Sequence, residues 1–413
     1  MKHLITVSLL LTFFTANVFA GGFQLNEHGA KAKAMGGAFT AVANDPSAIY
    51  WNGAGLTQLT GTHIMLGTHL IAPSTLFRGV SPNVDKYYME PQIFFPTHFF
   101  ASHSFSNDLA IGLGFTTPFG LGTKWPEEWV GKYLAIETEL RTFTISPVVA
   151  YEIIDNLSIS AAFVYSFADV TLTRKNSQAP FTGDAFVTLK GDDKFAYGYN
   201  FGLLFKPIEG LSVGAAFHSQ LKYEFEGDVV TTGAKQLLDA KKLPLGKATA
   251  KLEAPMYIAG GIAIDLTSRL KLSAEFQRIF WSSYDTLAVD FEDAAYTDLK
   301  SPRDYKDSYI IRLGGEYKFD DFSLLGGVYF DKMPVDPEKL SPTLPDSDRL
   351  GFSLGISADI LDNLNITGSY LFIRAKELTV TNSVEPYTPG GSGFNGTYNS
   401  YAHVLSLSLT YSL

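Results

Sequence analysis

The chain has 413 residues, of which 46% are hydrophobic and 14% aromatic, and it carries 32 basic against 42 acidic residues, a formal net charge of −10. This negative balance argues against nucleic acid as a partner. The absence of cysteine excludes disulfides, thiol catalysis and cysteine-based metal sites. The 32 Phe, 21 Tyr and 37 Gly, without long helical patterns, favour an all-β chain.

Residues 1–20 have the pattern of a secretory signal peptide. Lys2 and His3 form a basic start, Leu4 to Phe14 form an apolar run, and a cleavage site is expected between Ala20 and Gly21. The run is shorter than the about 20 apolar residues that a transmembrane helix needs, and no later stretch reaches that length. We therefore expect a secreted chain without a transmembrane helix.

Residues 21–60 differ from the rest of the chain because small residues dominate them. Glu27 to Met35 predict a short helix that ends at Gly36-Gly37. Asp45-Pro46 predicts the N-cap and first position of a further helical turn over Ser47 to Tyr50. A mostly helical segment ahead of a long β-chain suggests a plug inside a barrel, and an exposed N-terminal arm is the alternative.

Residues 61–413 alternate polar and apolar side chains over long stretches. From Leu211 to Phe225 one face is apolar throughout, and from Leu405 to Leu413 leucine and tyrosine alternate with serine and threonine. These runs exceed the five or six residues of common soluble strands and reach the about 9–11 that a tilted membrane strand needs. The final strand resembles the C-terminal signal of bacterial outer-membrane barrels, with Leu413 in place of the commoner phenylalanine.

Six short polar turns separate the alternating runs, and long irregular stretches lie between them. The turns are Ser106-Asn107-Asp108, Asp155-Asn156, Ile208-Glu209-Gly210, Asp265 to Arg269, Asp320-Asp321 and Asp362-Asn363. Six turns join twelve strands, and a first strand at about His63 to Ala72 and the last strand make fourteen. An even number of strands with short turns on one side predicts an all-β, fourteen-stranded antiparallel transmembrane barrel in the outer membrane of a Gram-negative bacterium.

The third strand, which begins at Leu109, meets a run of residues that break strands. These residues are Thr116, Thr117, Pro118, Phe119 and Gly120. Proline cannot donate a ladder hydrogen bond and glycine leaves a gap in the wall. Two interpretations remain: a kink that opens the side of the barrel, or a strand that simply ends at a loop.

The fifth strand begins at Leu157, and its register turns an apolar row toward the lumen. This row consists of Val164, Ala168, Val170, Leu172 and Arg174. An apolar wall that ends at a cation suits an amphiphile whose carboxylate lies near Arg174. A register shift that leaves Arg174 as a solvated loop residue is the alternative. Arg312 and Glu316 are also expected inside, in a paired ion bridge.

The long outer loops carry apolar residues that suggest a capture surface for a hydrophobic ligand. They are Phe181 and Phe186 in one loop, and Leu237, Leu238 and Leu243 in a short amphipathic helix expected within Lys235 to Leu245. Packing among the loops is the ordinary alternative.

The sequence contains no pattern that predicts an enzyme. His103-Ser104 and His218-Ser219 are isolated dipeptides, and HExxH, Walker A and dinucleotide motifs are absent. Gly390 to Gly393 has the composition of a loop and not of a phosphate site. We therefore expect neither catalysis nor a cofactor nor a metal site.

Several motifs together resemble the FadL/TodX family of outer-membrane transporters of hydrophobic compounds. They are FQLNEHGAKAKAMGGAF, NDPSAIYWNGAGL, PFGLGTKWPEEWVGKY, YKDSYIIRLGGEYKF, GGVYFDKMPVDPEKLSPTLPDSDRLGFSLG and the final strand, and they span the mature chain in order. One departure is WNGAG, where the family has an asparagine-proline-alanine-glycine run. Asn52 is kept, and Gly53 is expected to loosen the turn that proline would stiffen.

The resemblance implies a hatch at residues 21–60 inside a barrel at residues 61–413. It further implies that ligand passes from the outer loops to an apolar pocket and leaves sideways through the kink in strand 3, by passive, ligand-gated diffusion. The moving gate would be Gly21, Gly22, Phe23, Gln24 and Leu25, next to the hatch turn at Asn52. The pocket cations would be Arg174 and a second one at Lys300 or Arg303.

The expected partners are hydrophobic small molecules, either long-chain fatty acids or aromatic hydrocarbons, and the outer-membrane lipid and lipopolysaccharide around a monomeric barrel. A general porin or a structural barrel with adhesive loops is the main alternative. An outer-membrane lipase that uses His103 or His218 is a third.

Overall fold

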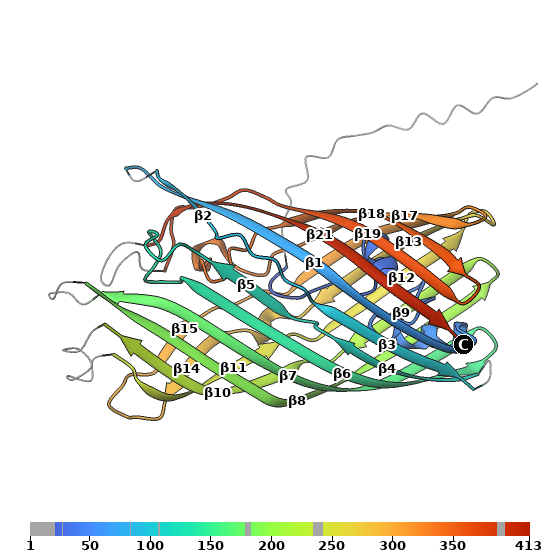
Figure 1. The fold of residues 1–413 in the computed structure, drawn as a ribbon, viewed down its shortest axis with the longest axis horizontal. Coiled ribbons are helices and arrows are strands. Elements are labelled where there is room, and N and C mark those ends of the chain that lie inside the picture. Colours follow the sequence, from blue (N-terminus) through green and yellow to red (C-terminus); the bar gives the residue numbers. More distant parts are fainter. Residues whose placement is uncertain are drawn as a thin grey trace, which may run out of the picture.

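The computed structural model describes residues 21–26, 28–82, 84–105, 108–177, 183–233, 243–385 and 393–413, so the expected signal peptide lies outside the described residues. These residues form a closed β-barrel that holds three short helices inside one end (Figure 1). Within these ranges, we find no helix with the length and apolar character that a membrane crossing requires.

Fourteen barrel strands run antiparallel to their neighbours, and several of them consist of two elements. The first seven are β1 (Gly61–Gly79); β2 (Lys86–Tyr88) with β3 (Thr97–Ser104); β4 (Leu109–Thr116) with β5 (Gly120–Lys124); β6 (Glu137–Ile154); β7 (Leu157–Ser177); β8 (Asp184–Ile208); and β9 (Leu211–His218) with β10 (Leu221–Thr232). The other seven are β11 (Gly246–Ala254) with β12 (Tyr257–Asp265); β13 (Leu270–Ile279) with β14 (Thr286–Phe291); β15 (Leu299–Pro302) with β16 (Ser308–Lys318); β17 (Phe322–Asp331); β18 (Arg349–Leu361); β19 (Leu364–Ala375) with β20 (Leu378–Val380); and β21 (Gly396–Ser412).

The barrel closes between its first and last strands. β1 pairs with β21 from His63 opposite Ser412 to Gly79 opposite Gly396. The expected turns join β6 to β7, β8 to β9, β12 to β13, β16 to β17 and β18 to β19, while Ser106 and Asn107 of the turn before β4 lie outside the described residues. The predicted count of fourteen strands is therefore confirmed. The first strand is longer than the expected His63 to Ala72.

Aromatic side chains on the outward face mark one edge of the lipid-facing band. Phe115, Phe143 and Phe167 stack side by side on β4, β6 and β7, with ring centroids 6.1 and 5.2 Å apart. The next outward pair of β6 and β7 beyond Phe143 and Phe167 is Arg141 and Asp169. These two side chains form an ion pair with nitrogen and oxygen 2.8 Å apart. Such a change from aromatic to charged residues is typical of the boundary between lipid and water.

The prediction of one strand with a single apolar face from Leu211 to Phe225 is wrong. The ladder breaks at Ser219-Gln220, where the Ser219 hydroxyl accepts a hydrogen bond from the Tyr199 backbone at 2.8 Å. Val213 faces outward and is exposed, whereas Leu221, Tyr223 and Phe225 beyond the break are buried in the lumen. The break inserts an odd number of residues into the period of two, so the apolar side chains change face.

The hatch, residues 21–60, contains α1 (Ala30–Ala34), α2 (Ala48–Trp51) and η1 (Gly53–Gln58), which are linked by turns. Two further 3₁₀ helices, η2 (Trp281–Ser283) and η3 (Pro337–Lys339), lie in outer loops. The helix expected over Glu27 to Met35 is shorter because Gly29 has a φ of 81°, which no helix allows. Gly36 and Gly37 end it with φ of 66° and 77°. The second helix starts at Ala48, and Asp45 accepts the Ser47 backbone N–H at 2.8 Å.

The hatch fills one end of the lumen and touches strands on several sides of the barrel. α1 packs on β17, β18, β19 and β21, and η1 packs on β3, β4, β6, β7 and β8. Backbone meets backbone at Gly327, where an added Cβ would lie 2.2 Å from the Gly36 nitrogen. Arg312 and Glu316 do lie inside, but in two separate bridges: Arg312 to Glu275 at 2.6 Å and Glu316 to Lys31 at 3.3 Å.

The turn at Asn52 fastens the hatch to the wall. The Asn52 amide donates to the Thr40 carbonyl at 2.8 Å and to the Leu203 carbonyl of β8 at 2.9 Å. An added Cβ on Gly53 would lie 2.8 Å from the Ser160 hydroxyl oxygen. Glycine here thus allows close contact with the barrel wall, in addition to the loosened turn that the sequence suggested.

Candidate functional site

Two apolar cavities lie in the half of the barrel that the hatch helices leave open. The inner cavity, of about 350 Å³, is lined by lumenal side chains of β7, β8, β10, β11 and β14. The side cavity, of about 550 Å³, lies between β1, β5 and the segment 89–96. Four residues line both cavities: Phe23, Leu121, Leu140 and Leu344. These four side chains form the partition between the two spaces.

The third strand is interrupted between the two cavities. β4 pairs with β6 as far as Thr116 opposite Thr144, and β5 resumes with Gly120 opposite Arg141. Three residues, Thr117 to Phe119, therefore face two residues of β6, which makes a bulge. The Thr142 hydroxyl satisfies the bulged backbone by accepting from the Phe119 N–H at 3.0 Å and donating to the Phe119 carbonyl at 2.7 Å.

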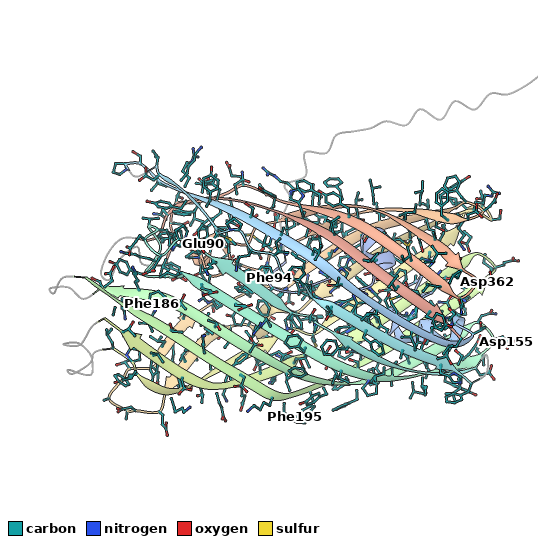
Figure 2. All side chains as sticks on the ribbon, in the orientation of Figure 1. Glu90, Phe94, Asp155, Phe186, Phe195 and Asp362 are labelled. Atoms are coloured by element: carbon teal, nitrogen blue, oxygen red, sulfur yellow. The ribbon has the colours of Figure 1, made fainter. Side chains whose placement is uncertain are left out.

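Beyond the bulge, β5 has a ladder partner on only one side among the described residues. On its other side, the Glu90 N–H donates to the Lys124 carbonyl at 2.7 Å, and the space between holds the side cavity. The Phe94 ring fills part of this space, since a Cβ on Gly122 would lie 2.0 Å from its Cζ (Figure 2). The barrel wall therefore has a side gap, residues 117–124 facing 89–96, that begins at the level of the stacked Phe115 row.

The N-terminal residues pair with this bulge as a short extra strand. The Leu25 N–H donates to the Pro118 carbonyl at 2.9 Å, and the Gly120 N–H donates to the Phe23 carbonyl at 3.0 Å. Gln24 lies opposite Phe119 in an antiparallel bridge. The Phe23 ring is buried between Phe119 and Trp281, with centroids 6.0 and 4.7 Å away. Residues 23–25 thus close the gap by main-chain hydrogen bonds and by one aromatic side chain.

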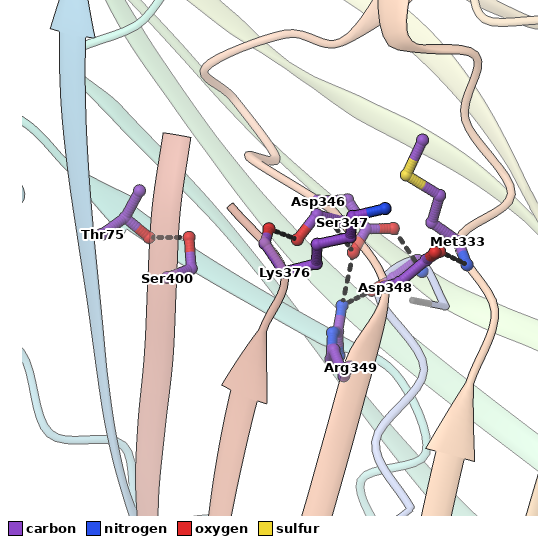
Figure 3. A network of polar contacts seen from close by, with 9 residues as sticks. Thr75, Met333, Asp346, Ser347, Asp348, Arg349, Lys376 and Ser400 are labelled. Atoms are coloured by element: carbon purple, nitrogen blue, oxygen red, sulfur yellow. Dashed lines mark hydrogen bonds and ion pairs between the residues drawn. The ribbon is translucent and has the colours of Figure 1, made fainter. Parts of the chain in front are cut away.

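A polar latch holds the chain just before this strand (Figure 3). The Gly22 N–H donates to an Asp346 carboxylate oxygen at 2.8 Å, and Arg349 donates to the Gly22 carbonyl at 2.8 Å and to Asp346 at 2.9 Å. Asp346 lies in the loop before β18, and burial raises the pKa of its carboxyl against the opposing effect of Arg349. Both hydrogen bonds to Gly22 involve a charged partner, so they are stronger than ordinary backbone bonds.

The predicted pocket residues do not all meet in one place. Val170, Leu172, Arg174, Lys300 and Arg303 line the inner cavity, but Val164 lines a separate space of about 40 Å³ behind Pro118 and Phe119. Lys300 is exposed, whereas Arg303 is buried. The ladder between β7 and β8 shifts its register between Ser166 and Ala168, with the extra residue on β8. β7 itself keeps one register with β6 up to Thr173, so Arg174 lines the inner cavity and is not a loop residue.

The residues expected on the capture surface do not form one surface among the described residues. Phe181, Leu237 and Leu238 lie outside the described residues. The loop expected at Phe186 is instead part of β8, and because Val187 lines the inner cavity, the Phe186 side chain points to the opposite face (Figure 2). Leu243 is buried, so the prediction of a presented side chain is wrong for Leu243.

Sequence reasoning missed much of the inner cavity wall. Phe225, Val229, Leu252 and Tyr284 line the cavity, and so does Glu385, in the loop between β20 and β21. The Ser219-Gln220 pair inside an otherwise apolar run was the signal for the change of face. No local signal indicates Glu385, because its position depends on loop packing.

Comparisons with known proteins agree with this geometry. The family model described as outer membrane protein transport protein (OMPP1/FadL/TodX) matches residues 11–413. A long-chain fatty acid transport protein of Escherichia coli is 22% identical, covering 97% of this chain and 99% of that protein. The structure of a Pseudomonas aeruginosa FadL homologue has a TM-score of 0.86 at 20% identity and covers 95% of this chain and 99% of that one. The structure of the P. putida toluene transporter TodX has a TM-score of 0.74 at 15% identity and covers 94% and 99%.

Proposed function

Because this chain belongs to the OMPP1/FadL/TodX family of outer-membrane transport proteins, we propose that it takes up long-chain hydrophobic carboxylates by lateral diffusion through the side gap. The family consists of outer-membrane transporters of hydrophobic compounds and not of enzymes. The single observation that carries the proposal is the partition: Phe23 of the N-terminal strand lies between the apolar inner cavity and a gap in the barrel wall.

The side route has a physical reason. Transfer of an acyl chain through water costs about 0.8 kcal/mol per CH₂ group, so a chain of about sixteen carbons requires an apolar path. The inner cavity and the side cavity provide apolar walls up to the level of the outward aromatic row. A ligand that leaves there enters the outer leaflet directly. The concentration gradient of the ligand drives the movement, and no nucleotide or ion gradient is needed.

The gate is the N-terminal strand. Two backbone hydrogen bonds to the bulge and the latch on Gly22 hold residues 22–25 in the closed position. A ligand in the inner cavity touches Phe23 and competes for its place in the aromatic cluster with Trp281. Displacement of Phe23 joins the cavities, while Asn52 keeps the rest of the hatch on the wall. A hatch that fills one end of the lumen argues against a general porin.

The ligand class follows from Arg174. Its guanidinium faces the inner cavity and makes no hydrogen bond or ion pair within the described residues. A desolvated guanidinium is costly unless an anion joins it, so the cavity favours a carboxylate over a neutral hydrocarbon. Aromatic hydrocarbons are the second candidate, supported by the overall likeness to the toluene transporter TodX. We further propose that the barrel is a monomer surrounded by outer-membrane lipid and lipopolysaccharide.

A disulfide across the gate tests the route, and the natural chain contributes no cysteine. Gln24 and Phe119 form a non-hydrogen-bonded antiparallel pair, whose Cα atoms are typically about 4.5 Å apart and within disulfide reach. In Gln24→Cys/Phe119→Cys, we expect oxidation to reduce palmitate uptake by cells at least about tenfold. Binding of palmitate to the purified barrel should persist, and reductant should restore uptake.

The matched control is Leu66→Cys/Leu409→Cys, which links directly opposite residues of β1 and β21, a seam that has no role in the gate. Oxidation of this pair should leave uptake unchanged. Uptake at the normal rate through the cross-linked gate would contradict the lateral route. Failure of the reduced protein to bind palmitate at all would contradict the assigned ligand.

A further inference from the structure

The inner cavity contains an internal carboxylate that the transport route does not explain. Glu385 reaches the cavity from the loop between β20 and β21, and its carboxylate lies 3.2 Å from the Arg303 guanidinium. The two side chains are only 16% and 10% exposed. The cavity is proposed to accept a carboxylate ligand. An acidic side chain there repels this ligand unless another protein group already balances the charge of the side chain.

The other charged side chains that line the cavity within the described residues are engaged in ion pairs or are exposed to solvent. Lys339 pairs with Asp304, and Lys251 pairs with Glu224 at 3.0 Å on the outward face. Lys300 is exposed. Among the described residues, the charged side chains that remain at the cavity wall are the buried Arg303 and the half-buried Arg174 and Glu385. Two positive charges and one negative charge leave a net charge of +1.

The position of Glu385 is fixed by its own loop. Its backbone N–H donates to the Ser383 hydroxyl at 3.2 Å, and its carbonyl accepts from the Phe394 N–H at 2.6 Å. The Phe394 ring stacks on Phe77 of β1 with centroids 4.7 Å apart. The carboxylate therefore reaches Arg303 from an anchored backbone. Its charge also acts on Arg174, the guanidinium that has no partner within the described residues.

We propose that Glu385 is a specificity-determining residue that restricts the inner cavity to amphiphiles with a single negative charge. This inference rests on the proposed uptake of hydrophobic carboxylates. Glu385 neutralises Arg303, so one carboxylate on Arg174 completes the charge balance. A head group with two negative charges meets Glu385, and among the described residues of the cavity wall the exposed Lys300 is the only other cation without an ion-pair partner. A neutral head group leaves Arg174 desolvated and unpaired.

Three ligands with the same sixteen-carbon tail test the inference: palmitate, hexadecyl phosphate and hexadecanol. Their dissociation constants are measured by calorimetry on the full mature barrel in detergent at about pH 8, where a phosphate monoester carries close to two charges. The natural protein should bind palmitate at least about tenfold more tightly than either of the others. Glu385→Gln raises the net charge to +2, so hexadecyl phosphate should gain about tenfold or more while palmitate changes by less than about threefold.

A pair of compensating charge-neutralising variants distinguishes this role from a merely structural one. Arg303→Gln reduces the net charge to zero, so palmitate binding should fall about tenfold. Adding Glu385→Gln to that variant returns the charge to +1 and should restore palmitate binding. Glu377→Gln is the matched control, because Glu377 is an exposed glutamate near the start of β20 that contacts Asn399.

The outcomes are distinct. If Glu385→Gln weakens all three ligands equally, or leaves the ratio of phosphate to palmitate affinity unchanged, Glu385 does not set specificity. If the double variant binds palmitate no better than Arg303→Gln, the charge balance is wrong. If the natural protein binds none of the three ligands, the proposed function fails as well, which distinguishes that failure from the failure of this inference.

Discussion

Replacing Glu275 by glutamine should release the hatch, because this one carboxylate ties the hatch to two strands. One Glu275 oxygen lies 2.6 Å from the Arg312 guanidinium, and both side chains are 1% exposed. The other oxygen accepts the N–H groups of Phe39 and Thr40 at 3.0 and 2.8 Å. Arg312 in turn donates to Asn26 at 3.1 Å, so the same pair holds the hatch and the residue that directly follows the gate.

The free-energy cost of this substitution follows from the burial of the ion pair between Glu275 and Arg312. Removing one partner of a buried ion pair costs about 3–5 kcal/mol because the other charge is left uncompensated. At 1.4 kcal/mol per factor of ten, the population of undocked hatch should rise by about two to three and a half powers of ten. The ladders of the barrel do not depend on Glu275, so the thermal unfolding of the barrel itself should change little.

Ion conductance in planar bilayers measures the undocked state, since a barrel without its hatch inside has an open lumen. Glu275→Gln should show frequent openings that the natural protein shows rarely, together with protease cleavage within residues 28–58. Glu224→Gln is the control, because Glu224 pairs with Lys251 in an exposed ion pair of little energetic value. Conductance and cleavage equal to those of the natural protein would refute the reasoning.

Two further predictions concern the site itself. Arg174→Ala should weaken palmitate binding by about tenfold or more without weakening hexadecanol binding, as calorimetry can measure; equal losses for both ligands would contradict the assigned carboxylate contact. Phe94→Ala removes the ring that packs at Gly122 in the side gap, so palmitate uptake by cells should accelerate while binding to the purified barrel stays the same. Slower uptake would indicate that the ring guides the ligand instead of obstructing it.

The sequence predicted the parts of the fold that depend on local chemistry. Six polar turns were sufficient for the count of fourteen strands, because each turn type is set by a few residues in succession. The interruption at Pro118 was visible for the same reason, since proline acts on its own backbone. The lumenal position of Arg174 followed from the alternation of side chains along β7, because the register shift of the β7–β8 ladder places its extra residue on β8.

Features that depend on distant packing escaped prediction. The change of face at Ser219-Gln220 requires knowledge that one extra residue is accommodated there, and alternation alone cannot supply it. Phe186 belongs to a strand because β8 extends far beyond the lipid-facing band. Glu385 reaches Arg303 across 82 residues of sequence, through a loop whose course is set by Phe77 and Phe394.

The contact between Gly327 and Gly36 joins the hatch and the wall without any side chain between them. Two surfaces that meet backbone to backbone cannot adjust by changing rotamers, so their shapes must be inherited together. A chimaera that combines the hatch of a relative with this barrel should therefore assemble only if the relative's hatch has glycine at the position of Gly36. In evolutionary terms, the hatch and the barrel form a single heritable unit, although they are separate parts of the fold.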